Sequence, residues 1–244
     1  MADAEWRRIA GFRVVMSWPQ AAYAPPPSVP ASRRARWAGL LGALLVVAGT
    51  VMAGVALGNQ IHAPQPPPAA AGVVGPLAGQ GLSLRRSVPL AVDIPAIGVH
   101  SPLLRLGVNP DGTIQVPSLS TQVSEAAWYR YSATPGQRGA SVIEGHVDSY
   151  RGPAVFFRLG DLRPGDAIRV RLADGVTAVF RVTGVRAYAK SRFPAGAVYR
   201  ASRYAALRLI TCGGVFDSYT RSYLGSVVVF ASLASWRHSA ALTG

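Results

Sequence analysis

The chain has 244 residues, 50% of them hydrophobic, and a formal net charge of +14. This length suits one domain of ordinary size with tails, and the apolar content excludes disorder throughout the chain. The positive charge is scattered, with clusters only at residues 33–36 and 85–86, and no zinc-finger, RNP or helix-turn-helix pattern accompanies it. We therefore expect no nucleic acid as a partner, whereas an anionic cell wall or lipid headgroup fits the charge.

The N-terminal part of the chain predicts a membrane anchor. Residues 1–36 contain several prolines and lack sustained periodicity, which predicts a disordered cytoplasmic tail. Residues 38–57 form an uncharged apolar run of about 20 residues, enough for a helix to cross a bilayer, so we place a transmembrane anchor at 37–58. Arginines precede this run and no charge follows it before Arg85, so the positive-inside rule leaves the N-terminus in the cytoplasm. A cleaved signal peptide is the alternative.

The rest of the chain is expected to lie outside the cell membrane and to divide into three parts. Residues 59–85 are rich in proline, alanine and glycine, a composition typical of an extracytoplasmic spacer. A folded catalytic domain is predicted at 86–236, followed by a short C-terminal tail at 237–244.

Short apolar runs separated by turn signals follow Val88 and predict an all-β barrel or sandwich. Residues 167–172 and 176–185 are expected to pair as a hairpin around Asp174-Gly175. Three further runs have the length of core strands, and two short helical turns are expected. The core runs are Ser141–Glu144, Leu207–Thr211 and Val227–Ala231, and the helical turns are Pro153–Leu159 and Arg200–Ala205.

The sequence holds a single cysteine, Cys212, which follows a predicted strand and precedes two glycines that let backbone approach a ligand closely. A lone cysteine excludes an intramolecular disulfide and a zinc site built on several thiolates. A free thiol in an exported domain is a liability unless it is buried or reactive. Cys212 is therefore either a catalytic nucleophile or a buried residue acting as a small hydrophobe.

Two further side chains could complete a cysteine-based site. His146 follows a strand-like segment and a glycine, and a cysteine nucleophile commonly needs such an imidazole as base and acid. Its alternative role is that of a loop histidine bonded to backbone. Arg221 lies on the return segment before the next apolar run, where adjoining strands could bring it beside Cys212 to stabilise an oxyanion.

Five segments of the chain resemble the sortases, and specifically the class F branch common in actinobacteria. The similarity runs from about Ile94 to Leu233 and is carried by Ile94–Val99, Asn109–Thr113, Val142–Ser149, Gly165–Asp166 and Leu209–Asp217. The resemblance implies an all-β fold, an eight-stranded sortase-type β-barrel with short helices, preceded by one transmembrane helix.

The resemblance also implies a reaction and its site. It places a His-Cys-Arg constellation on His146, Cys212 and Arg221, and it gives Thr211 a role in binding the substrate or the oxyanion. In this family the cysteine attacks the Thr-Gly bond of a sorting signal similar to LPxTG, and an amine resolves the thioacyl enzyme. The partners implied are sorting-signal peptides of secreted proteins and a cell-wall or peptide amine, with no metal and no cofactor. We expect Cys212 to react as thiolate with His146 protonated.

Several positions depart from the family pattern. Arg208 replaces a usual threonine and is expected to face solvent or a groove, and residues 224–226 read Leu-Gly-Ser where an Asp-Asn pair is usual. Glu144 could raise the pKa of His146 if it points inward. Asp148 either orients His146 or caps a loop.

Two other functions stay open at this point. An L,D-transpeptidase also pairs an exported cysteine with a histidine on a β-rich fold, although the residues around Cys212 do not fit its usual pattern. A membrane-tethered cell-wall binding module could retain a sortase-like barrel without turnover.

Overall fold

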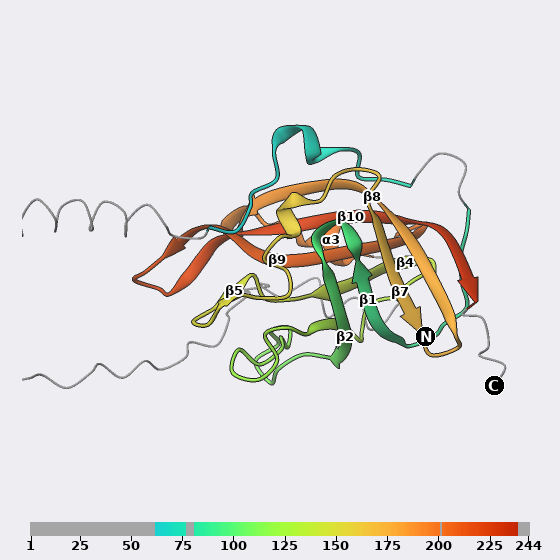
Figure 1. Cartoon of the computed structure of the whole chain (residues 1–244), viewed down its shortest axis with the longest axis horizontal. Helices are drawn as coiled ribbons and strands as arrows, with labels where there is room; N and C mark the ends of the chain where they lie inside the picture. The colour runs from blue at the N-terminus through green and yellow to red at the C-terminus, as the bar shows by residue number, and fades with distance from the viewer. Residues whose placement is uncertain (1–61, 77–80, 201, 239–244) are drawn as a thin grey trace, which may run out of the picture. The chain divides into compact units, whose positions relative to one another are not determined.

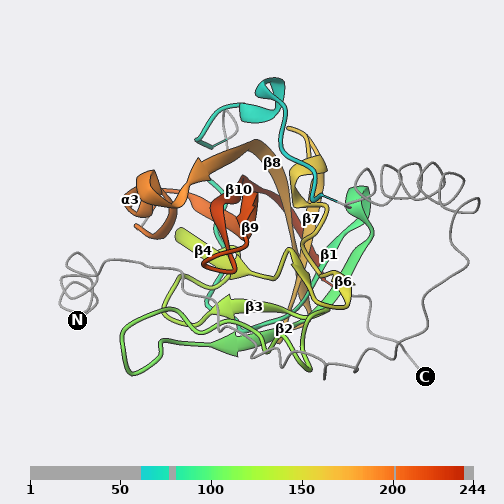
Figure 2. The same ribbon diagram turned by 90° about the vertical axis from the view of Figure 1, so that its left-hand side faces the viewer.

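Eight strands close into a barrel within the part of the chain that the computed structural model describes, residues 62–76, 81–200 and 202–238. Their order around the barrel is β1-β2-β3-β4-β9-β10-β8-β7 (Figures 1 and 2). The strands are β1 (Pro89–Ile94), β2 (Val99–Leu106), β3 (Ala126–Tyr129), β4 (Gly139–Glu144), β7 (Ala167–Leu172), β8 (Val176–Ala189), β9 (Ala205–Asp217) and β10 (Ser222–His238). The predicted all-β barrel of eight strands is thus confirmed.

Short elements fill the connections between the strands. A separate two-stranded ribbon pairs β5 (Asp148–Ser149) with β6 (Gly152–Pro153). The helical elements are η1 (Pro68–Ala71), η2 (Pro95–Ile97), η3 (Leu159–Asp161), η4 (Lys190–Arg192) and α3 (Ala195–Tyr199). The helical turn predicted at 200–205 lies earlier, in α3, because Pro194 precedes that helix and proline favours a helix start. The turn predicted at 153–159 is likewise displaced, since Pro153 pairs in β6 and η3 begins at Leu159.

The hairpin of β7 and β8 matches its prediction. Asp174 accepts a hydrogen bond from the Val176 backbone N–H at 3.1 Å, and Gly175 has a φ of 81°, which a residue with a side chain rarely adopts. The Asp-Gly pair therefore sets the turn, and the strands pair from Arg171–Thr177 onward.

Apolar side chains pack on both faces of β4, β9 and β10. Their inward residues belong to the large core inside the barrel, together with Trp128 and Phe180. Their outward residues form a second cluster with α3. That second cluster consists of Tyr129, Val142, Val198, Tyr199, Ile210, Val228 and Phe230. Strands covered on both faces read as continuous apolar runs, which is why these segments do not alternate in the sequence.

The chain before β1 packs against the barrel along part of the region expected to be a spacer. Ala70 is fully buried, the Val73 N–H donates to the Thr183 carbonyl at 2.9 Å, and Arg186 Nε donates to the Ala71 carbonyl at 3.1 Å. Gly160 lies against the backbone of Pro64, where a Cβ would come within 2.0 Å of the carbonyl oxygen. These contacts attach residues 64–73 to β8 and to the segment around η3.

The predicted cytoplasmic tail, 1–36, and membrane anchor, 37–58, lie outside the described residues. Within the residues that are described, no helix is both long and apolar enough to cross a membrane.

Candidate active site

The register of β4 and β9 brings His146 beside Cys212. The two strands run parallel with Glu144 opposite Ile210, and the Gly145 N–H donates to the Ile210 carbonyl at 3.1 Å. Two residues further along each strand are His146 and Cys212, and neighbouring strands lie about 5 Å apart. Both side chains are buried, with exposed fractions of 3% and 4%. The base and nucleophile predicted from the sequence are therefore neighbours, with His146 just beyond the end of β4 and Cys212 within β9.

The alternation of side chains along β9 separates Cys212 from Thr211. Ile210 belongs to the outer cluster, so Cys212 lies on the outer face of the barrel and Thr211 on the inner one. Thr211 is buried, and its hydroxyl has no hydrogen-bond partner among the described residues. Its predicted role in binding substrate stays a prediction, and only its main chain faces the same region as the thiol.

The histidine ring is held in one orientation by backbone. His146 Nε2 lies 2.6 Å from the carbonyl oxygen of Pro117, so Nε2 carries the proton and donates it to that oxygen. In the neutral ring the proton acceptor is then Nδ1. Burial lowers the pKa of His146, and the bond to Pro117 opposes this effect. Burial therefore favours the neutral imidazole over the protonated ring expected from the sequence.

Glu144 points away from His146 and toward α3. Tyr199 donates its hydroxyl proton to Glu144 Oε1 at 3.0 Å, while Oε2 is buried without a partner. Burial raises the pKa of Glu144 to about 7, and it drives the pKa of Tyr199 well above its usual value. The causes that shift the pKa of His146 are burial and the Pro117 carbonyl, so the effect anticipated from Glu144 is not found.

Asp148 is bound by a tyrosine that the sequence did not single out. Tyr223, at the start of β10, donates its hydroxyl proton to Asp148 Oδ2. Burial raises the pKa of Asp148, and burial, Asp148 and the charge of Cys212 all raise the pKa of Tyr223. Tyr223 therefore lies within electrostatic range of the thiol and ties the β9–β10 hairpin to the segment that follows His146. Figure 1 shows that hairpin and the β5–β6 ribbon at the same end of the barrel.

Arg221 lies at the tip of the same hairpin. It is exposed, has a φ of 51°, and precedes β10 by one residue. The residue opposite Cys212 is Ser226, five positions further along, which corresponds to about 16 Å of extended strand. The register therefore brings His146 and Cys212 together, whereas Arg221 lies further along the hairpin, and its catalytic role stays a prediction.

The residues where an Asp-Asn pair was expected are constrained by close backbone packing. Gly225 pairs with Gly213, and a Cβ on Gly225 would lie 3.0 Å from the carbonyl oxygens of Gly213 and Tyr188. Ser226 is buried, and its hydroxyl has no hydrogen-bond partner among the described residues. A larger residue at 225 would push β9 and β10 apart beside the thiol.

Arg208, which was expected to face solvent or a groove, is buried. Its side chain is only 3% exposed, and its guanidinium carbon lies 4.7 Å from the centre of the Phe230 ring. Its Nη1 donates to the Leu207 carbonyl at 3.1 Å. The aromatic ring and the backbone thus replace water around a charge that the sequence pattern alone would place outside.

No group of three or more histidine, cysteine, aspartate or glutamate side chains that could hold a metal ion occurs in the ranges that the structure describes. The described site is a buried thiol beside an imidazole whose acceptor nitrogen is Nδ1, flanked by a tyrosine–aspartate pair. A thiol and an imidazole placed in this way can carry out acyl transfer, with the thiol as nucleophile and the imidazole as its base.

Most of the described chain matches one family of known proteins. The Sortase domain family matches residues 92–234. Similar solved structures include sortase A of Listeria monocytogenes, with 17% identity, a TM-score of 0.47, and coverage of 64% of this chain and 92% of that one. The SrtA sortase of Actinomyces oris has 20% identity, a TM-score of 0.46, and coverage of 68% and 88%. A sortase D5 transpeptidase of Clostridium perfringens has 17% identity, a TM-score of 0.43, and coverage of 61% and 79%. The search of curated proteins found no match.

Proposed function

Because the chain belongs to the sortase family, we propose that it is a membrane-anchored cysteine transpeptidase of the class F type with its catalytic domain outside the cell membrane. It cleaves an LPxTG-like sorting signal between threonine and glycine and transfers the threonine carbonyl to an amine of the cell wall. The observation that carries this proposal is the β4–β9 register, which sets His146 beside the only cysteine of the chain.

The first half of the reaction is acylation of Cys212. His146 Nδ1 takes the thiol proton, and the sulfur attacks the threonine carbonyl carbon. The tetrahedral species then collapses with cleavage of the carbon–nitrogen bond, and the imidazolium returns its proton to the departing glycine amine. The Pro117 carbonyl, 2.6 Å from Nε2, stabilises the imidazolium that forms between these steps.

The second half reverses the roles. An incoming amine attacks the thioester carbon and loses a proton to Nδ1 of His146, the carbon–sulfur bond breaks, and Cys212 leaves as thiolate. It is then reprotonated from the imidazolium. Water in place of the amine gives hydrolysis as the side reaction.

In both halves of the reaction a negative charge develops on the carbonyl oxygen of the substrate, and hydrogen-bond donors or a positive charge must stabilise it. Arg221 supplies a positive charge from the hairpin, which must bend toward Cys212 when substrate binds. Thr211 contributes through its main chain, because its side chain faces the barrel interior. The hydrogen bond of Tyr223 to Asp148 holds this hairpin two residues from Arg221.

Mass spectrometry of the full-length chain with an LPxTG-type peptide and a triglycine acceptor tests the reaction. We expect a product in which the peptide, cut after threonine, is joined to the acceptor, and we expect none with the Cys212→Ala variant. Cleavage without joining would indicate a peptidase. No cleavage, together with no labelling of the thiol by a small methanethiosulfonate reagent, would favour a binding module.

A further inference from the structure

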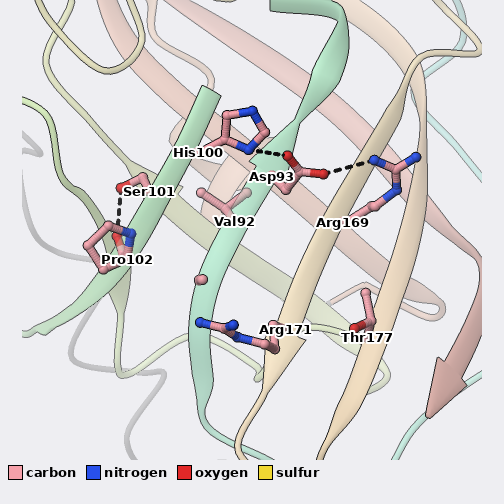
Figure 3. A pocket seen from close by; sticks show the side chains of 9 residues that line it. Val92, Asp93, His100, Ser101, Pro102, Arg169, Arg171 and Thr177 are labelled. Atoms are coloured by element: carbon pink, nitrogen blue, oxygen red, sulfur yellow. Dashed lines mark hydrogen bonds and ion pairs between the residues drawn. The ribbon is translucent and has the colours of Figure 1, made fainter. Parts of the chain in front are cut away.

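The barrel carries a pocket on the wall opposite the thiol. The pocket has a volume of about 390 Å³ and opens on the outer face of β1, β2 and β7 (Figure 3). In the closed ring of eight strands β1 is four strands from β9 in either direction, so the pocket and Cys212 lie on opposite sides. Its lining residues are Ala91, Val92, Asp93, His100, Ser101, Pro102, Arg169, Arg171 and Thr177.

The hollow exists because a small residue lies between two larger ones. Ala91 pairs with Pro102 on one side and with Arg171 on the other, so these three share the outer face in one row. A methyl side chain leaves the space above the row empty. Figure 3 shows Arg171 extending from β7 toward β1.

The neighbouring row holds the single acid of the pocket, and that acid is already neutralised. Asp93 Oδ1 lies 2.6 Å from His100 Nδ1, and Asp93 Oδ2 accepts a hydrogen bond from Arg169 Nη1 at 2.8 Å. Figure 3 shows both contacts, of which the one from Arg169 to Oδ2 is a hydrogen bond and the one between His100 and Oδ1 is a close polar contact. Asp93 serves to hold Arg169 and His100 at the rim of the pocket.

Arg171 has no such acid. None of the ion pairs found among the described residues includes it. Arg171 on β7 pairs with Thr177 on β8, and Thr177 pairs on its other side with Arg237 on β10. A cation, a hydroxyl and a second cation therefore follow each other along one row of the outer face, with no acid among them.

We propose that this pocket binds a phosphate group carried on a small polar chain such as glycerol phosphate. The guanidinium of Arg171 presents a planar fork of N–H donors that matches two phosphate oxygens, and the Thr177 hydroxyl donates to a third. The volume leaves room for the attached chain beyond the phosphate itself. Glycerol phosphate occurs both in wall polymers and in lipid headgroups, and the site recognises the chemistry that the two share. This binding is independent of transpeptidation, because the residues of the pocket lie on the opposite side of the barrel from Cys212.

Calorimetric titration of sn-glycerol 3-phosphate into the full-length chain at low ionic strength tests the site. We expect saturable binding that Arg171→Gln weakens about tenfold, because one charge-assisted bidentate contact is lost. Thr177→Val, which keeps shape and charge, is expected to weaken binding about threefold. The matched control is Arg203→Gln, which removes the same charge from the exposed β8–β9 connection and leaves binding unchanged.

Sedimentation with phosphatidylglycerol and phosphatidylcholine vesicles separates the two sources of the ligand. If Arg171→Gln reduces binding to phosphatidylglycerol vesicles and Arg203→Gln does not, the pocket takes a lipid headgroup. If vesicle binding is the same in all variants while glycerol phosphate binding depends on Arg171, the pocket takes a wall or soluble phosphate. The proposal is overturned if glycerol phosphate does not saturate, or if Arg171→Gln and Arg203→Gln weaken its binding equally.

Discussion

Replacing Glu144 by glutamine should change how the stability of this protein depends on pH. Glutamine has nearly the same shape and still accepts the Tyr199 hydroxyl through its oxygen, whereas it never carries the charge. In the folded protein, burial raises the pKa of Glu144 from 4.5 to about 7. The native state therefore holds this proton more tightly than the unfolded chain, and the stability that results is complete below pH 4.5 and lost as the pH rises through 7.

The size of the change in stability follows from the shift in the pKa of Glu144. A difference of about 2.5 pKa units, from 4.5 to about 7, corresponds to about 3 kcal/mol of unfolding free energy. We expect Glu144→Gln and wild type to be similar in stability near pH 4.5, and the variant to be about 3 kcal/mol more stable than wild type near pH 8.5.

Urea unfolding, followed by tryptophan fluorescence at several pH values between 4.5 and 8.5, measures this difference. The lowered pKa of His146 acts in the opposite sense, because its stabilisation grows as the pH rises toward 6.5. It is common to both proteins, so subtracting the two profiles removes it. Glu125→Gln serves as the matched control, since Glu125 is outside the buried cluster. A difference between variant and wild type that stays constant across the pH range would refute the reasoning.

Three further outcomes are expected. Tyr223→Phe removes the hydroxyl that binds Asp148, so kcat/KM with an LPxTG-type peptide should fall about tenfold; Asp148→Asn should cost a similar factor, and full additivity of the two losses would contradict a shared role. Gly225→Ala forces a Cβ to within 3.0 Å of two carbonyl oxygens and should lower the free energy of unfolding by about 1–3 kcal/mol, and an unchanged urea midpoint would argue against the tight packing. Since burial lowers the pKa of His146, the acid limb of the kcat/KM profile should lie below pH 6.5, and a limb above that value would exclude a neutral resting imidazole as the base for Cys212.

Much of the fold could be predicted because it depends on local patterns. The Asp-Gly turn with alternating residues on either side defines β7 and β8, and β7 has the predicted bounds, Ala167–Leu172. A run of apolar residues that ends in Thr211-Cys212-Gly213 predicts a core strand with the thiol near its end. β9 nevertheless continues to Asp217, because the hairpin goes on pairing beyond the glycines.

Other features depend on which strands become neighbours. The alternation of residues along a strand predicts the strand itself and does not specify its neighbours. Arg208 has the composition of a surface residue, yet α3 and the surrounding strands cover its face and Phe230 lies beneath its guanidinium. The position of Arg221 follows from the hairpin register, and spacing from Cys212 along the chain gives no information about it.

The sequence by itself determined the class of fold, the single thiol after an apolar run and the histidine after a strand-like segment, because turn residues, strand periodicity and residue chemistry are local properties. Only the tertiary structure decided the partners of the remaining polar groups. Asp148 binds Tyr223 across 75 residues and Glu144 binds Tyr199 across 55. Such contacts arise when closure of the barrel and the packing of α3 remove these groups from water, since most buried polar groups are then stabilised by whichever partner the register places beside them.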